Sequence, residues 1–124
     1  MSSKPADDPN SAWPWPDSLD AVVAAPDFHK PLFENPRVRV LHTRIAPGQR
    51  VPLHTHRWPS VQLILSWGSL IRRDQLGNVT YDTRQTEAPQ LNRPLWLERL
   101  PPHTVENVGD TEFNVILVEI KDTC

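Results

Sequence analysis

Apolar and polar side chains alternate with a period of two along most of the chain after Pro31. Such alternation predicts β-strands that turn one face toward a core. Turns that contain glycine or proline, such as those at residues 46–49 and 75–78, separate the alternating segments. Short strands at this close spacing predict an antiparallel sandwich or barrel. The strands are expected at residues 38–43, 51–56, 61–67, 71–73, 79–83, 95–98, 104–107 and 113–120.

One segment departs from the strand pattern. Residues 18–25 read Ser-Leu-Asp-Ala-Val-Val-Ala-Ala, which predicts a helix of about two turns. Asp17 or Ser18 can serve as its N-cap, and Pro26 ends it.

The first residues predict an extended arm rather than part of the core. Residues 1–16 are rich in Pro, Ser and Asp, with Trp13 and Trp15 placed between prolines. Large apolar rings usually pack against something, so these tryptophans are expected to hold the arm on the barrel or on a second subunit. The expected organisation is an arm with a short helix over residues 1–30 and one barrel domain over residues 31–122.

Composition narrows the picture further. The chain has 124 residues, which favours one domain, and its 14 prolines favour short strands and turns over long helices. Thirteen Lys and Arg against fifteen Asp and Glu give a net charge of -2, so nothing in the charge favours nucleic acid or a membrane as partner. The single cysteine, Cys124, excludes an internal disulfide. No apolar stretch is long enough to span a bilayer, and we expect a cytoplasmic protein.

Histidines carry the clearest chemical signal. His54 and His56 stand two residues apart on a predicted strand, so their rings share a face and can reach one ion, at about 2.0–2.1 Å from each nitrogen for zinc. His103 follows two prolines at the start of another strand and is the third candidate ligand. His29 and His42 are the remaining histidines. His42 alternates with Val38 and Val40 and could also face inward, but no second ligand-like residue lies beside it.

At these positions the sequence resembles the cupin superfamily. Gly48, His54, His56 and Gly68 stand at the spacing of the first cupin motif, Gly-x5-His-x-His-x3,4-Glu-x6-Gly. In the second motif, His103 and Asn107 keep the final His-x3-Asn. The resemblance covers roughly residues 32–121 and implies an all-β fold, a double-stranded β-helix or jelly-roll barrel. It also implies a homodimer, since small cupins often pair.

The resemblance has one departure with chemical weight. The glutamate of the first motif would fall at Ser60 or Val61, and neither can be a carboxylate ligand. What remains resembles the three-histidine cupins, in which His54, His56 and His103 would hold one divalent metal ion. Fe(II) is favoured, with Zn, Ni, Mn or Cu as alternatives. A non-haem iron dioxygenase acting on a small anionic metabolite is the leading function. A metal-dependent lyase, isomerase or hydrolase, or a non-catalytic small-molecule-binding module, is the alternative.

Substrate contacts are expected near the histidine pair. Arg57 and Trp58 follow it directly, and at the mouth of the barrel they could hold a carboxylate and stack on a planar group. Arg72 and Arg73 occupy neighbouring strand positions, so at most one of them faces inward. A solvated edge is expected for both, and an inward arginine would need an anionic partner such as the substrate.

Two further expectations concern the barrel wall. Val61, Leu63 and Leu65 share a strand face and should line the interior. If a bulge shifts the register by one residue, Gln62 turns inward instead and can hydrogen-bond a substrate. Asn107 is expected to fix the turn before Gly109 through its side chain.

Overall fold

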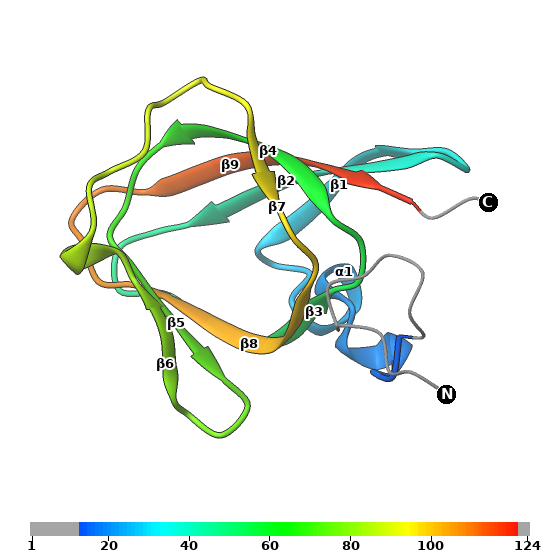
Figure 1. Cartoon of the computed structure of the whole chain (residues 1–124), viewed down its shortest axis with the longest axis horizontal. Coiled ribbons are helices and arrows are strands. Elements are labelled where there is room, and N and C mark those ends of the chain that lie inside the picture. Colours follow the sequence, from blue (N-terminus) through cyan, green and yellow to red (C-terminus); the bar gives the residue numbers. More distant parts are fainter. Residues whose placement is uncertain (1–12, 122–124) are drawn as a thin grey trace, which may run out of the picture.

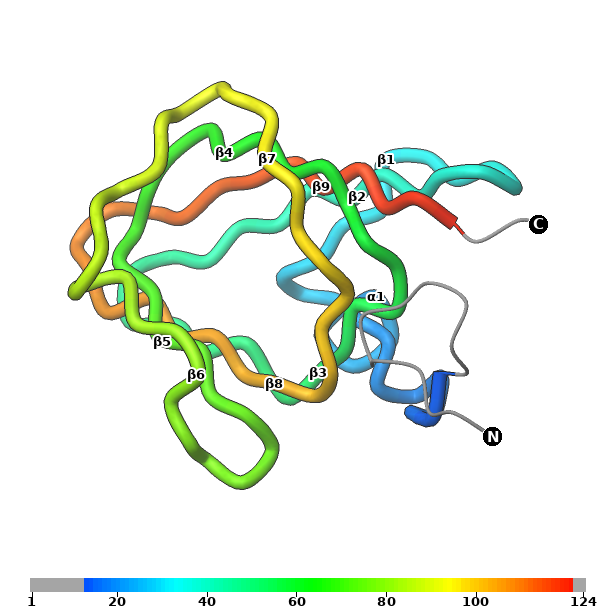
Figure 2. Tube along the Cα trace, in the orientation of Figure 1, coloured from blue at the N-terminus to red at the C-terminus, as the bar shows by residue number. Residues whose placement is uncertain are grey.

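Two antiparallel sheets curve around a shared interior (Figure 1). The structure is a computed structural model that describes residues 13–121. The five-stranded sheet has the order β1-β2-β9-β4-β7, and the four-stranded sheet has the order β3-β8-β5-β6. The strands are β1 (His29–Glu34), β2 (Val38–Ile45), β3 (Arg50–His56), β4 (Ser60–Ser66), β5 (Leu70–Asp74), β6 (Val79–Asp82), β7 (Leu95–Leu97), β8 (Leu100–Asn107) and β9 (Phe113–Ile120). In the Cα trace, β2, β9 and β4 run along one side of the interior, and β3 and β8 along the other (Figure 2).

Every strand expected from the alternating pattern is present, and the barrel adds one that the pattern did not reveal. This strand is β1, which begins inside the range assigned to the arm. Its register with β2 shifts between Pro31 and Phe33, and only His29 on the strand is buried. A bulged edge strand that contains proline shows no regular alternation, so its sequence does not look like a strand.

The expected continuous helix over residues 18–25 is wrong. The chain forms a 3-10 turn, η1 (Asp17–Leu19), and then one turn of helix, α1 (Ala21–Ala24). Between them Asp20 is extended, with φ -56° and ψ 141°. Its carboxylate caps no helix but binds Arg39, and its backbone bridges to Thr55. These tertiary contacts outweigh local helix propensity.

The remaining helical element is the short turn η2 (Thr83–Gln85). No helix within residues 13–121 is long and apolar enough to cross a membrane. The part of the expected arm before Trp13, and Cys124, lie outside the described residues. Within them, the Arg99 guanidinium stands 5.0 Å from the Trp13 ring, so this tryptophan packs on the barrel.

Register between β2 and β9 decides which faces turn inward. Arg39 pairs with Glu119 and Leu41 with Leu117, and all four side chains are buried. His42 lies on the opposite face, where its Nε2 and Asn114 Oδ1 form a 2.5 Å hydrogen bond. The core between the sheets comprises Ala25, Leu41, Ile45, Val51, Ile64, Leu70, Phe113, Val115 and Leu117.

The expected inward face of β4 is wrong. Leu65 is exposed, whereas Ser60 and Ile64 are buried, and Gln62 on the same face lines the interior. The apolar residues Val61 and Leu63 therefore belong to the outer side of the five-stranded sheet. Alternation alone could not distinguish the two faces, because both carry apolar side chains.

Asn107 holds the turn between β8 and β9, as expected. Its Nδ2 donates to the carbonyls of Ile45 and Thr111 at 2.9 Å, and its Oδ1 accepts from Gly109 N. Gly68 packs directly against this side chain, and a Cβ there would stand 2.6 Å from Asn107 Nδ2. The two cupin-motif residues thus form one closely packed junction.

Candidate metal centre

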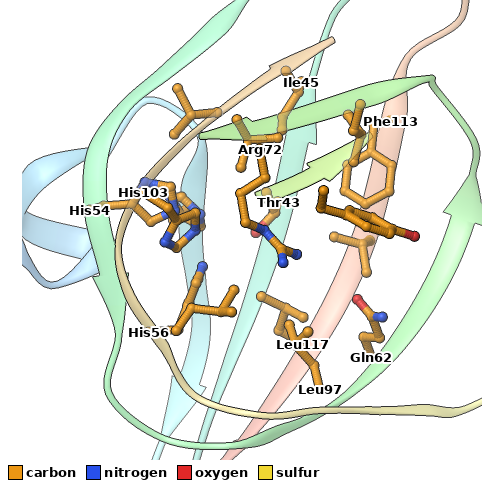
Figure 3. A pocket seen from close by; sticks show the side chains of 17 residues that line it. Thr43, Ile45, His54, His56, Gln62, Arg72, Leu97, His103, Phe113 and Leu117 are labelled. Atoms are coloured by element: carbon orange, nitrogen blue, oxygen red, sulfur yellow. The ribbon is translucent and has the colours of Figure 1, made fainter. Parts of the chain in front are cut away.

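Two paired strands bring the predicted histidines together. His54 on β3 stands opposite His103 on β8 in the ladder, and their ring centroids lie 4.3 Å apart. The His56 ring lies 5.0 Å from His54 and 5.6 Å from His103. All three side chains are buried, and they gather at one end of the cavity (Figure 3).

A fourth histidine, which the sequence pattern did not reveal, joins this cluster. His29 is the first residue of β1, and its ring centroid lies 4.7 Å from that of His54 and 5.3 Å from that of His56. The candidate ligand atoms of His29, His54 and His56 all lie within 4.8 Å of one another. His103 is not part of that group, so the tightest triad differs from the predicted one. No spacing rule connects His29 to a pair 25 residues later on another strand.

Backbone carbonyls fix the tautomers of three rings. Nδ1 of His54 lies 2.7 Å from Pro52 O, Nδ1 of His103 lies 2.7 Å from Pro101 O, and Nδ1 of His29 lies 3.1 Å from Ala25 O. A carbonyl oxygen can only accept, so Nδ1 carries the proton in each ring. The lone pair of each neutral imidazole is then on Nε2, which is free to bind a metal.

A buried carboxylate plays the same part for the fourth ring. Glu119 Oε2 lies 3.4 Å from Nδ1 of His56, and its Oε1 accepts a 2.5 Å hydrogen bond from Arg39 Nε. Arg39 also donates through both terminal nitrogens to Asp20 at 2.7 and 2.9 Å. Burial raises the pKa of Glu119, and the hydrogen bond from Arg39 opposes that rise. Carboxylate–histidine pairs of this kind orient metal ligands in proteins.

Burial keeps the cluster neutral. It lowers the pKa of His29 and of His54 to about 3, and repulsion from neighbouring imidazoles adds to the effect. The pKa values of His56 and His103 are also lowered well below 6.5, chiefly by burial. Neutral imidazole is the form that binds metal, so the cluster is ready to bind a divalent ion at neutral pH without first losing protons.

The histidines form one end of a cavity of about 70 Å³. Its wall is otherwise mostly apolar, and the polar side chains on it include Thr43, Gln62 and Arg72. Arg72 turns inward, which corrects the expected solvated edge, while Arg73 lies outside the lining and pairs with Glu106 at 3.1 Å. Gln62 lines the cavity, the alternative that the sequence left open.

The structure does not bring Arg57 and Trp58 to this cavity. Arg57 is exposed and lies 3.7 Å from a carboxylate oxygen of Asp17. Three cations surround the Trp58 ring, with Arg39 at 5.0 Å and Arg57 and Lys121 both at 5.4 Å from its centroid. Neither side chain is among those that line the histidine cavity. Arg57 and Trp58 instead line a separate pocket, together with Asp17, Asp20 and Thr55.

Comparison with known proteins identifies the architecture. No protein-family model and no curated protein matches the sequence. A cupin domain from Bordetella pertussis Tohama I is similar in structure, with 26% identity over 77% of this chain and 93% of that chain and a TM-score of 0.61. An RmlC-like cupin family protein from Methanocaldococcus jannaschii, with a double-stranded β-helix fold, has 13% identity over 75% of this chain and 78% of that chain and a TM-score of 0.53. By its fold and its histidine spacing, this chain belongs to the cupin superfamily.

Proposed function

We propose that this chain is a metal-dependent enzyme that acts on a small anionic metabolite by a dioxygenase-type reaction. One observation carries the proposal. Four buried, neutral imidazoles meet at one end of a mostly apolar cavity, and each has its Nδ1 held by an acceptor. This donor set fits a divalent ion, because every ring keeps a free Nε2.

A divalent ion held there would supply Lewis acidity and, if it were iron(II), redox chemistry. Neutral ligands would leave the full charge of that ion uncompensated, which favours an anionic partner. The mostly apolar wall lowers the local dielectric constant and so strengthens electrostatic interactions inside the cavity. Glu119 would hold the His56 ring in the orientation that presents Nε2.

The lining also bears on the type of reaction. Among the described residues that line the cavity there is no Asp, Glu, Lys or Cys. A lyase, isomerase or hydrolase that depends on a carboxylate, amine or thiolate base therefore has less support than an oxidation. The same observation favours a second candidate, a small-molecule-binding module without catalysis.

The first experiment measures metal and oxygen together. Protein purified without added ions is analysed for metal, reconstituted anaerobically with Fe(II), and tested for O₂ uptake with a diketone, a thiol or a catechol-like acid. We expect about one iron per chain and uptake with one of these compounds. The variant His56→Ala should lose the metal, whereas His42→Ala, on the outer face, should keep it.

The outcomes separate the candidates. Zinc or nickel without O₂ uptake would contradict the dioxygenase and favour another metalloenzyme. Binding of small molecules by a protein that takes up no metal, even after reconstitution, would favour the binding module. Equal metal content in His56→Ala and the unaltered chain would show that the ion binds elsewhere.

A further inference from the structure

One arginine inside the barrel has no carboxylate partner among residues 13–121. Arg72 extends from β5 into the cavity, between the histidine end and the end marked by Phe113 and Gln62 in the view of Figure 3. Its Nε is buried and has no hydrogen-bond partner. Its guanidinium carbon lies 5.1 Å from the ring centroid of Tyr81, a cation–π contact that leaves the charge unpaired.

A second orphaned polar atom lies in the same cavity. Of the described residues, only Arg72 and Thr43 have a buried side-chain atom without a hydrogen bond, and both line the histidine cavity. Unpaired buried polar groups are rare because each costs free energy, so two in one cavity indicate a missing polar partner. The buried Arg39, in contrast, is paired with the carboxylates of Glu119 and Asp20.

The charge of Arg72 acts on the same space as the histidines. It contributes to lowering the pKa values of His54, His56 and His103, so the guanidinium lies within electrostatic reach of all three rings. No described carboxylate lines the cavity, and Glu119 is already engaged by Arg39 and His56. The interior is therefore positive before any ion binds, and a divalent ion would make it more so.

We propose that Arg72 binds the carboxylate of a small, partly apolar substrate beside the histidine cluster, with Thr43 as a further hydrogen-bonding group. A guanidinium pairs with a carboxylate through two parallel hydrogen bonds, and burial strengthens that pair. The cavity of about 70 Å³ has room for roughly five water-sized groups, so a short-chain acid is the simplest ligand to test. This inference rests on the proposed function for the identity of the ligand as substrate, but the binding itself does not need the metal.

The test uses the full chain freed of metal by a chelator and then dialysed. Binding of acetate, propionate and butyrate is measured by calorimetry, with propionamide as the uncharged analogue and chloride and phosphate as competing anions. We expect carboxylates to bind and propionamide not to bind. Arg72→Met should weaken carboxylate binding by at least about tenfold. Arg73→Met, which changes the neighbouring outward-facing arginine, should stay within about twofold of the unaltered chain.

Two measurements guard against a trivial result. Arg72→Met removes an unpaired buried charge, so we expect it to unfold at an equal or higher denaturant concentration. If it does not fold, Arg72→Gln replaces it in the same assay. Equal carboxylate affinity in a folded Arg72 variant, or equal binding of propionamide, would overturn the proposal. Phosphate or chloride binding in preference to all carboxylates would overturn the assignment to an organic acid.

The same samples separate this inference from the proposed function. Carboxylate binding through Arg72 in a protein that takes up no metal would refute the metalloenzyme and leave the arginine site in place. Metal uptake together with carboxylate binding that does not change in the Arg72 variants would refute the arginine site and leave the metalloenzyme in place.

Discussion

At the scale of single residues, acceptor groups decide the chemistry of the cluster. Three carbonyls and one carboxylate accept hydrogen bonds from Nδ1–H, and burial makes a second proton on any ring costly. The rings are thus held as neutral ligands. Keeping the rings neutral should make the folded protein sensitive to acid. As the pH falls, the histidines of the unfolded chain bind protons that the buried histidines of the folded chain do not bind.

We expect the metal-free protein to lose stability as the pH falls from about 6.5 toward 3. The histidine pKa is 6.5 in the unfolded chain and about 3 for His29 and His54 in the folded one, so the unfolded state binds more protons throughout this window. Each such histidine contributes about 1.4 kcal/mol per pH unit. Urea unfolding at several pH values measures the slope. His29→Gln should reduce it and His42→Gln should not, and a slope unchanged in His29→Gln would contradict the assignment.

The carboxylate behind His56 gives a second test. Glu119→Gln keeps the shape of the side chain but removes the charge that holds Nδ1–H, so metal affinity should fall by about 10- to 100-fold. Competition with a chromophoric chelator measures the affinity. Glu112→Gln is the matched control, because Glu112 pairs with Arg44 on the surface. An unchanged affinity in Glu119→Gln would mean that this carboxylate does not act on the ligand.

At the scale of strands, register places the cluster. The His-x-His spacing of β3 and the position of His103 were sufficient to predict that these three rings meet, because the cupin motifs fix where both strands pair. His29 could not be predicted, since the bulge in β1 removes the alternation that marks a strand. Arg72 was ambiguous for a different reason. Sequence shows that one of two adjacent arginines faces inward but not which one.

The junction between β8 and β9 should contribute strongly to stability. Asn107→Ala removes three hydrogen bonds of a fully buried side chain and leaves their partners unsatisfied. We expect a loss of about 2–4 kcal/mol in the free energy of unfolding. Chemical denaturation measures it, with Asn78→Ala in the exposed β5–β6 turn as the control, expected within about 0.5 kcal/mol. A loss in Asn107→Ala no larger than in the control would contradict the role of this side chain.

At the scale of the whole molecule, a row of apolar side chains crosses the outer side of the five-stranded sheet. Phe33, Val40, Val118, Val61 and Trp96 are successive register partners, so they form one row across all five strands. The ends of this row are open to solvent, with Phe33 57% and Trp96 56% exposed. An apolar row of this length is typical of a surface that another protein covers.

A homodimer remains our prediction, and this row is the surface that we expect it to use. Trp96→Lys should shift the chain from dimer to monomer in sedimentation velocity, because it places a charge at the contact. Leu76→Lys, at the tip of the β5–β6 turn and 83% exposed, should leave the association unchanged. A monomeric unaltered chain at micromolar concentration would refute the prediction.

The way in which two rings keep their protons has a wider consequence. His54 and His103 each donate a hydrogen bond from Nδ1–H to the carbonyl of a proline two positions earlier, within the tripeptides Pro-Leu-His and Pro-Pro-His. A hydrogen bond within three consecutive residues therefore fixes which nitrogen of the ring carries the proton. The distance between the two rings depends instead on the pairing of β3 with β8. A design that places such a tripeptide on a strand of another sheet should obtain a histidine whose Nε2 is free to bind a metal. Only the direction in which the ring points would then have to be designed.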